Sequence, residues 1–227
     1  MGIAERRQRE RQQRRQLILE AARRVFFQHG YRQATMDMIA AEAELGKATL
    51  YEYFANKEEL YVALLDDGLR LLDALMAEVS EQTREMPAER AIREIARQYW
   101  TYAQQYPEYF TLLMHVSTAI ELPLEKVRPE LLQELHQLQE RALLRGVELV
   151  RRGIREGLFP PDTVPERVLA EFWIVLSGAI LLARHPYRMR LMQEMEPEQL
   201  LEELVTLLLQ GWQWRVEHSS SEGASSR

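Results

Sequence analysis

Apolar residues recur at intervals of three and four along almost the whole chain, and this spacing constrains the possible folds more than any other feature of the sequence. Such spacing gathers apolar side chains on one face of an α-helix. We find no convincing stretch with the alternation of apolar and polar residues that indicates a half-buried strand. The sequence therefore predicts an all-α protein with about nine helices.

Proline, glycine and capping residues punctuate this pattern, because proline fits a first helical turn and glycine readily ends a helix. The expected N-terminal helices are one over about 11–29 ended by Gly30, one capped by Thr35, a very short one opened by Gly46, and a long one from Asn56 to about Thr83. Later helices are expected after Pro87, at Pro107 and Pro129, after Pro165 and at Pro197. The Ser/Gly-rich tail 219–227 is expected to be disordered.

Composition excludes several classes of protein. The 227 residues suit one large or two small domains, and the absence of cysteine rules out a disulfide framework, a thiolate zinc site and a cysteine nucleophile. The longest charge-free apolar stretch, 172–183, is 12 residues long, well short of the roughly 18 to 20 that cross a bilayer. Residues 17–19 are too few for the apolar core of a secretory signal. We expect no membrane partner and a cytoplasmic location in a prokaryote-like cell.

The net charge of −6 hides a division of charge along the chain. Residues 1–57 contain eleven Lys and Arg against seven Asp and Glu, a balance of +4. The remainder contains eighteen against twenty-eight, a balance of −10. A small basic segment joined to a larger acidic one suggests that the basic part meets a polyanion, although a charge run is often only a solvated face.

Three short helices within the first 57 residues, the second and third joined by a tight turn, predict a helix-turn-helix. Individual residues make the assignment more specific than the helix pattern alone. They are Gly30-Tyr31, Thr35, Met38-Ile39-Ala40, Ala43 and the run Thr49-Leu50-Tyr51-Glu52-Tyr53-Phe54-Ala55-Asn56-Lys57-Glu58-Glu59-Leu60. Over about 16–60 they closely resemble the DNA-binding signature of the tetracycline-repressor (TetR) family of bacterial regulators. The remainder resembles that family in its length and helical layout.

The expected DNA contacts follow from where each residue lies. The helix 46–53 suits the major groove, where it would present Lys47, Ala48 and Thr49, then Tyr51 one turn later. Thr35, with a hydroxyl and the N-terminus of a helix, suits a phosphate. By resemblance, Tyr51, Tyr53 and Lys57 are further phosphate contacts, although Tyr53 equally suits the core. Leu50 and Phe54 are expected to be core residues.

The chain departs from the family pattern at three positions. Glu44 stands where the family usually has the turn glycine, Gly46 where it has a capping serine, and Ala48 where it has a glycine. Glu44 is expected to strain the turn and to add a negative charge near the duplex, while Ala48 offers a methyl group that suits a thymine methyl.

Within residues 1–15, six arginines outnumber two glutamates. Arg14 and Arg15 are included among the candidate DNA-binding residues. The segment 1–15 is either an arm that reaches along the minor groove or backbone, or a solvated helical extension. The sequence leaves both interpretations open.

The acidic part of the chain is expected to dimerise. A helix over 166–184 that is apolar on nearly all sides needs partners on more than one face, and by resemblance it forms a four-helix interface with 200–214 of each subunit. Alternatively, both helices complete the monomer core. The candidate interface residues are Trp173, Leu176, Gly178, Ile180, Leu204, Leu208 and Trp212.

Members of this family usually bind a small molecule between their middle helices, and here those helices are aromatic. The candidate residues for an apolar or aromatic effector are Trp100, Tyr106, Phe110, Met114, His115 and Trp173. For any single member, a packed core role is the simpler interpretation. The helix 57–83 would carry the signal, with Asp66, Asp67 and Gly68 either a pivot or an ordinary solvated turn.

An enzyme is not expected. The Glu-x-x-His pairs of di-iron bundles, the nucleophile elbow Gly-x-Ser-x-Gly, His-Glu-x-x-His and a phosphate-binding glycine loop are all absent from the sequence. We expect no cofactor and no metal.

The predicted organisation is an Arg-rich extension (1–15), a helix-turn-helix domain (16–57), a ligand-binding and dimerisation domain (58–218) and the tail. The predicted protein is a ligand-released repressor that binds a palindromic operator as a homodimer; the alternative is a helical scaffold without a DNA role.

Overall fold

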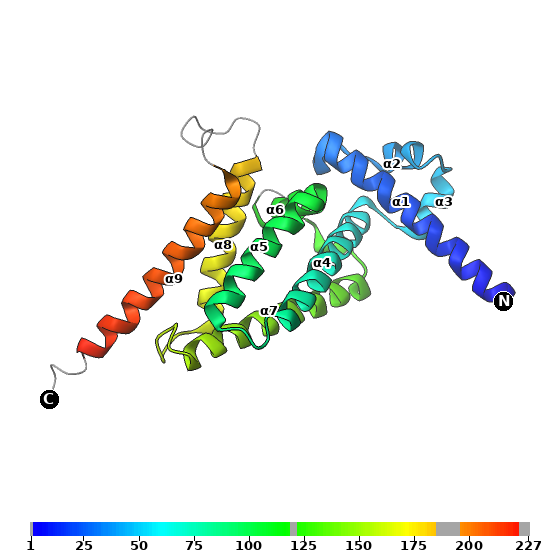
Figure 1. Cartoon of the computed structure of the whole chain (residues 1–227). Coiled ribbons are helices and arrows are strands. Elements are labelled where there is room, and N and C mark those ends of the chain that lie inside the picture. Colours follow the sequence, from blue (N-terminus) through cyan, green and yellow to red (C-terminus); the bar gives the residue numbers. More distant parts are fainter. Residues whose placement is uncertain (1, 119–121, 185–195, 223–227) are drawn as a thin grey trace. The chain divides into compact units, whose positions relative to one another are not determined.

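The computed structural model describes residues 2–118, 122–184 and 196–222 (Figure 1). Within those ranges the chain is helical and contains no strand, which confirms the predicted all-α fold. The helices are α1 (Ile3–Gln33), α2 (Met36–Glu42), α3 (Lys47–Tyr53), α4 (Lys57–Gln82), α5 (Ala88–Gln105), α6 (Pro107–Thr118), the short 3₁₀ helix η1 (Leu124–Lys126), α7 (Pro129–Arg155), α8 (Pro165–Arg184) and α9 (Pro197–Glu222).

The two ends of the chain differ from what the sequence predicted. Helix α1 begins at Ile3 rather than near residue 11, because Arg, Gln and Glu are good helix formers and no glycine or proline interrupts residues 3–29. Gly30 ends its regular part as predicted, with a φ of +73° that glycine adopts readily. At the other end, α9 continues through 219–222, which were expected to be disordered. The remaining tail, 223–227, lies outside the described residues.

The chain divides into two compact units, each made of two segments. The first unit is Met1–Leu69 with Glu108–Gln137, and the second is Arg70–Pro107 with Leu138–Arg227. The chain passes from the first to the second within α4, between Leu69 and Arg70. The predicted helix-turn-helix domain thus forms only part of a larger unit, which also takes in the first half of α4 and most of α6.

One apolar cluster holds the first unit together. Ile18, Leu19 and Phe26 on α1 pack with Leu50 at the centre of α3 and with Leu60 on α4, all nearly or completely buried. A ring of three aromatic side chains lies within it: Phe26, Tyr31 and Tyr61, whose centroids are 5.1 to 6.0 Å apart. The helix-turn-helix is therefore built directly on the first turns of α4.

In the second unit, α5, α8 and α9 pack against one another, and α8 and α9 lie side by side (Figure 1). The hydroxyl groups of Tyr99 and Ser177 are 2.9 Å apart and join α5 to α8. The Arg93 guanidinium donates to the Thr206 hydroxyl at 2.8 Å and joins α5 to α9.

Across the described residues, every helix is too short or too polar to cross a membrane.

Candidate nucleic-acid interface

The turn between α2 and α3 is a tight helix-ending turn with an unusual residue at its centre. The Leu45 amide donates to the Ala40 carbonyl at 2.9 Å and the Glu44 amide to the Ala41 carbonyl at 3.1 Å. This pair of bonds defines the Schellman motif, which requires a left-handed residue and usually takes glycine. Glu44 occupies that position with a φ of +55°. The expected strain at Glu44 is therefore present in the structure.

The helix caps lie where the sequence predicted them. Thr35 Oγ1 accepts a hydrogen bond from the Met38 amide at 3.2 Å, and its side chain remains exposed with its hydroxyl hydrogen available to a further acceptor. Gly46 begins α3 through its backbone conformation, without a side-chain cap. Asn56 Oδ1 accepts from the Glu59 amide at 2.9 Å and so caps α4.

Helix α3 is held by two core residues and presents its other side chains outward. Leu50 and Phe54 are buried, as predicted. The other side chains of the helix are exposed or half-buried: Lys47, Ala48, Thr49, Tyr51, Glu52 and Tyr53. The Lys47 ammonium lies 2.6 Å from Asp37 Oδ2 across the α2–α3 turn, where both side chains remain accessible to solvent. The predicted groove-facing residues therefore share an accessible helix.

The first four turns of α1 face α3 across a cleft of about 570 Å³. The cleft is lined by Arg7, Glu10, Arg11, Arg14, Thr49, Glu52 and Tyr53. The Arg11 guanidinium lies 5.9 Å from the centroid of the Tyr53 ring, and the Arg15 guanidinium lies 5.5 Å from that of Phe54. Arg7 and Arg11 belong to the Arg-rich segment 1–15 but were not among the individual DNA-binding candidates, because the sequence alone does not show which face of that segment adjoins α3.

Lys57 has a different setting from the predicted phosphate contact. Its Nζ donates to the carbonyl oxygens of Tyr31 at 3.0 Å, Arg32 at 3.4 Å and Ala34 at 3.2 Å. It also lies 4.6 Å over the Tyr31 ring. All three ammonium hydrogens therefore serve the corner between α1 and α2. In this structure the Lys57 ammonium therefore holds the corner of the helix-turn-helix, and its phosphate contact remains a prediction.

The buried carboxylates at the start of α4 are all partnered. Tyr31 donates its hydroxyl to Glu58 Oε1 at 3.1 Å. Burial raises the pKa of Tyr31, and the Glu58 carboxylate raises it further, so the phenol stays protonated at neutral pH. Glu59 accepts from the Ala55 amide at 3.0 Å and from Arg128 Nε at 2.8 Å. These bonds fix the segment that follows α3.

The candidate effector residues fall in both units. Phe110, Met114 and His115 belong to the first unit, and Trp100, Tyr106 and Trp173 to the second. Trp100, Phe110 and Met114 are packed core residues, whereas His115 and Trp173 are exposed and Tyr106 is half-buried. The Trp100 indole donates to Glu198 at 3.3 Å. Packing therefore accounts for the three buried side chains.

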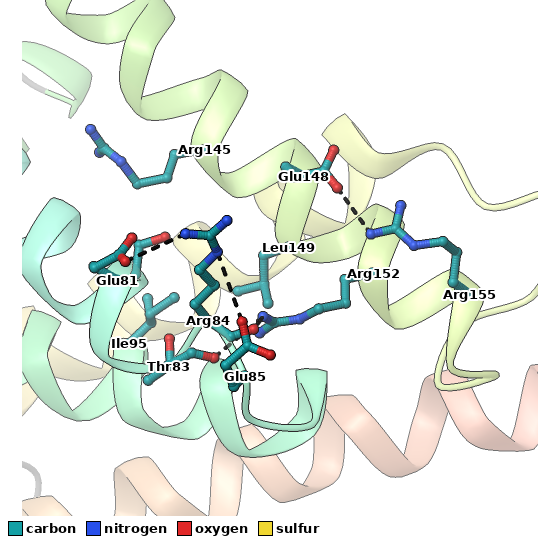
Figure 2. A pocket seen from close by; sticks show the side chains of 11 residues that line it. Glu81, Thr83, Arg84, Glu85, Ile95, Arg145, Glu148, Leu149, Arg152 and Arg155 are labelled. Atoms are coloured by element: carbon teal, nitrogen blue, oxygen red, sulfur yellow. Dashed lines mark hydrogen bonds and ion pairs between the residues drawn. The ribbon is translucent and has the colours of Figure 1, made fainter.

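A cavity of about 490 Å³ lies elsewhere in the second unit, where the end of α4 meets α5 and α7 (Figure 2). Its lining comprises Ser80, Glu81, Thr83, Arg84, Glu85, Ile95, Arg145, Glu148, Leu149, Arg152 and Arg155. None of them was predicted as a site residue, because the cavity brings together segments 50 or more residues apart. Among the described residues, no group of three or more His, Asp or Glu side chains is arranged to hold a metal ion.

The arginines of this cavity have two kinds of environment. Arg145 contacts Asp73 at 2.8 Å, and Arg152 donates to the carbonyl oxygens of Thr83 and Arg84, so both hold the end of α4 in place. Arg84 and Arg155, by contrast, are mostly exposed, and their ion pairs are with equally exposed glutamates. Exposed pairs of this kind contribute only about 0–1 kcal/mol and exchange easily with a ligand.

The candidate interface residues divide between the core and the surface. Leu176, Ile180 and Trp212 are buried within the second unit and pack in its core. Among the side chains of α8 and α9 whose burial is described, the large apolar ones that are exposed are the predicted Trp173 together with Ile174, Leu181, Leu182 and Leu207, while the predicted Leu204 and Leu208 are half-buried. A Cβ at Gly178 would meet no atom within 4 Å.

Two family profiles match the chain. The profile described as "Bacterial regulatory proteins, tetR family" matches residues 18–64. The profile described as "Tetracyclin repressor-like, C-terminal domain" matches residues 92–208, more than half of the chain. Together they agree with the resemblance inferred from the N-terminal motif.

Individual relatives point the same way. The HTH-type transcriptional repressor SCO4008 of Streptomyces coelicolor is 32% identical over 165 residues, which cover 70% of this chain and 77% of that protein. The uncharacterized HTH-type transcriptional regulator YhgD of Bacillus subtilis is 54% identical over 48 residues, or 21% of this chain, and the chain spans only 25% of its length. The TetR family transcriptional regulator PfmR of Thermus thermophilus shares the fold, with a TM-score of 0.64, 21% identity, and coverage of 85% of this chain and 97% of that one.

The left-handed conformation of Glu44 can be tested by substitution. Glu44→Gly and Glu44→Ala both remove the carboxylate, but only glycine tolerates a positive φ without strain. We expect the glycine variant to be more stable than the alanine variant by about 1 kcal/mol in urea denaturation. An alanine variant as stable as the glycine variant would contradict the strained turn.

Proposed function

This chain belongs to the TetR family of bacterial transcriptional regulators, and on that premise we propose that it is a repressor that binds a palindromic operator as a homodimer and releases it when a small molecule binds. The observation that carries the proposal is the accessible face of α3, held on the core by Leu50 and Phe54. A repressor of this kind would act in the bacterial cytoplasm, where the chromosome lies.

In this proposal α3 reads the major groove. Lys47 and Thr49 donate hydrogen bonds to base edges, and the Ala48 methyl group contacts a thymine methyl. Tyr51 lies one turn further along and is half exposed, which lets its side chain reach base edges in the groove. Thr35 and Tyr53 hold phosphates, because the N-terminus of α2 adds a positive dipole end to the Thr35 hydroxyl.

We further propose that α8 and α9 form the dimer interface. A single recognition helix reads only a short half-site, so specific binding needs two helix-turn-helix domains related by a two-fold axis. Ile174, Leu181, Leu182 and Leu207 leave apolar surface on two adjacent helices, and soluble proteins rarely expose such surface without a partner. The space beside Gly178 allows the partner helix to approach closely.

The effector in this proposal binds the cavity at the end of α4. Ile95 and Leu149 supply apolar surface, and Arg84 and Arg155 supply cations whose present partners are replaceable. We therefore propose an effector with an apolar body and an anionic group. Helix α4 would transmit the signal, because its first turn is part of the helix-turn-helix core and its last turn lines the cavity.

The operator proposal is tested by selecting genomic fragments that bind the protein and measuring affinities by mobility shift. Tyr51→Ala should lower operator affinity by about 5- to 100-fold and change binding to random duplex little, because a lost base contact costs roughly 1–3 kcal/mol. Phe27→Ala removes an equally exposed aromatic side chain from α1 and should leave both affinities unchanged. If the wild-type chain bound no genomic DNA fragment, the proposal would be contradicted.

The interface proposal predicts that Gly178→Arg converts the protein to a monomer. The open space around Gly178 accommodates the new side chain within one subunit, so the fold should persist while a charge enters the apolar interface. Sedimentation velocity should show the monomer, and operator binding should be lost with it. Gln139→Arg adds the same charge on the exposed side of α7 and should remain a dimer. A dimeric Gly178→Arg protein would place the interface elsewhere.

The effector proposal predicts that Leu149→Trp fills the cavity and abolishes the response. Carboxylates with long alkyl or aromatic bodies serve as probes, and one present at about 100 times its Kd adds roughly 2.7 kcal/mol to the free energy of unfolding. We expect this thermal shift, and the accompanying operator release, in the wild type and in Trp100→Phe but not in Leu149→Trp. If Trp100→Phe lost the response and Leu149→Trp kept it, the effector site would instead lie among the aromatic residues around Trp100.

A further inference from the structure

The N-terminal extension, residues 3–15 of α1, does not contribute to the core. From residue 4 onward, the first buried side chain of α1 is Ile18, and the side chains of residues 4–17 are exposed except for the partly covered Arg15. Almost four turns of helix therefore extend beyond the apolar cluster of the first unit, in which α1, α3 and α4 pack together. Their six arginines and two glutamates need an explanation other than packing.

Three of the arginines form a row on one side of the helix. Arg7, Arg11 and Arg14 are spaced by four and three residues, which places them on one face. All three line the cleft shared with Thr49 and Glu52 of α3. The row is therefore directed to the same side of the first unit as the recognition helix.

These three guanidinium groups are also available. Glu5 accepts from the Gly2 amide at 3.0 Å, and Glu10 pairs with Arg6 at 3.3 Å. No carboxylate of the described ranges lies within ion-pair distance of Arg7, Arg11 or Arg14. A row of unneutralised cations beside a DNA-reading helix is complementary to a polyanion.

Helical geometry decides where this row can bind. An α-helix with side chains is about 10–12 Å wide, whereas the minor groove of B-DNA is only about 6 Å wide. The extension therefore cannot follow the minor groove as an extended arm would. Seven residues of helix span roughly 10 Å, which matches about three steps along a DNA strand.

We propose that Arg7, Arg11 and Arg14 form a rigid second DNA contact, which grips the sugar–phosphate backbone bordering the major groove that α3 enters. The inference rests on the proposed operator binding. Of the two interpretations of segment 1–15, the contact combines the helical extension with a DNA-binding role, and the segment forms part of helix α1. Its partner is duplex DNA of any sequence, because phosphates carry no base identity.

The test measures Kd against salt concentration for the wild type, Arg7→Gln/Arg11→Gln/Arg14→Gln, and the single variant Arg11→Gln. Glutamine keeps helix propensity while removing charge, and circular dichroism verifies that the helix persists. Each phosphate contact contributes about 0.9 to the slope of log K against log salt, and a dimer makes each contact twice. We expect Arg11→Gln to lower the slope by about 2 and the triple variant by about 5, with operator and random duplex weakened by similar factors.

Arg9→Gln is the matched control, because Arg9 lies on the opposite side of the same helix and its Nε faces the Glu5 carbonyl. It should change the slope little. A triple variant with the wild-type slope would overturn the second DNA contact while leaving operator binding intact. Equal decreases of the salt slope in Arg9→Gln and Arg11→Gln would also overturn this contact, because a general effect of charge does not depend on the face of the helix. Absence of DNA binding by the wild type would instead overturn the proposed function.

Discussion

The corner between α1, α2 and the start of α4 is the constraint on which the DNA-binding part of the structure depends. A single ammonium group, Lys57 Nζ, binds three carbonyl oxygens there, including that of Tyr31. These carbonyls follow the glycine that ends the regular part of α1 and would otherwise lack partners. The two neighbouring residues, Glu58 and Glu59, are buried and bound to groups of other segments. The first turn of α4 is thereby locked to α1, and α3, which ends only four residues before it, is held in place.

Helix α4 is the continuous segment that leads from the helix-turn-helix into the second unit. Gly68 lies near the end of the first unit, where a Cβ would approach Tyr109 Cδ1 to 2.9 Å, so α4 and α6 pack closely there. Helix α4 continues unbroken through Asp66 and Asp67 into the second unit. In the proposed function, a ligand at the last turn of α4 contacts the same helix whose first turn supports α3, and its effect on DNA binding is limited to the difference in its affinity for the two states.

The features that the sequence predicted well are those decided by neighbouring residues. The caps at Thr35 and Asn56, the glycine at position 30 and the strained Glu44 depend on local backbone chemistry, and all occur as expected. The role of Lys57 depends on carbonyls more than 20 residues away, which no local pattern reveals. Helix α8 is apolar on nearly all sides, so its sequence does not distinguish the buried Leu176 and Ile180 from the exposed Ile174. Only packing against α5 and α9 separates them. The cavity is likewise the product of distant segments.

The central claim is that two copies of this chain read two half-sites of one operator. Hydroxyl-radical footprinting on a selected genomic fragment measures this most directly, because it reports every protected sugar on both strands. A homodimer on a palindromic operator should give two equivalent protected regions related by a two-fold axis, with centres about 34–36 Å apart or a multiple of that distance. A single protected half-site, or two regions of the same orientation, would contradict it.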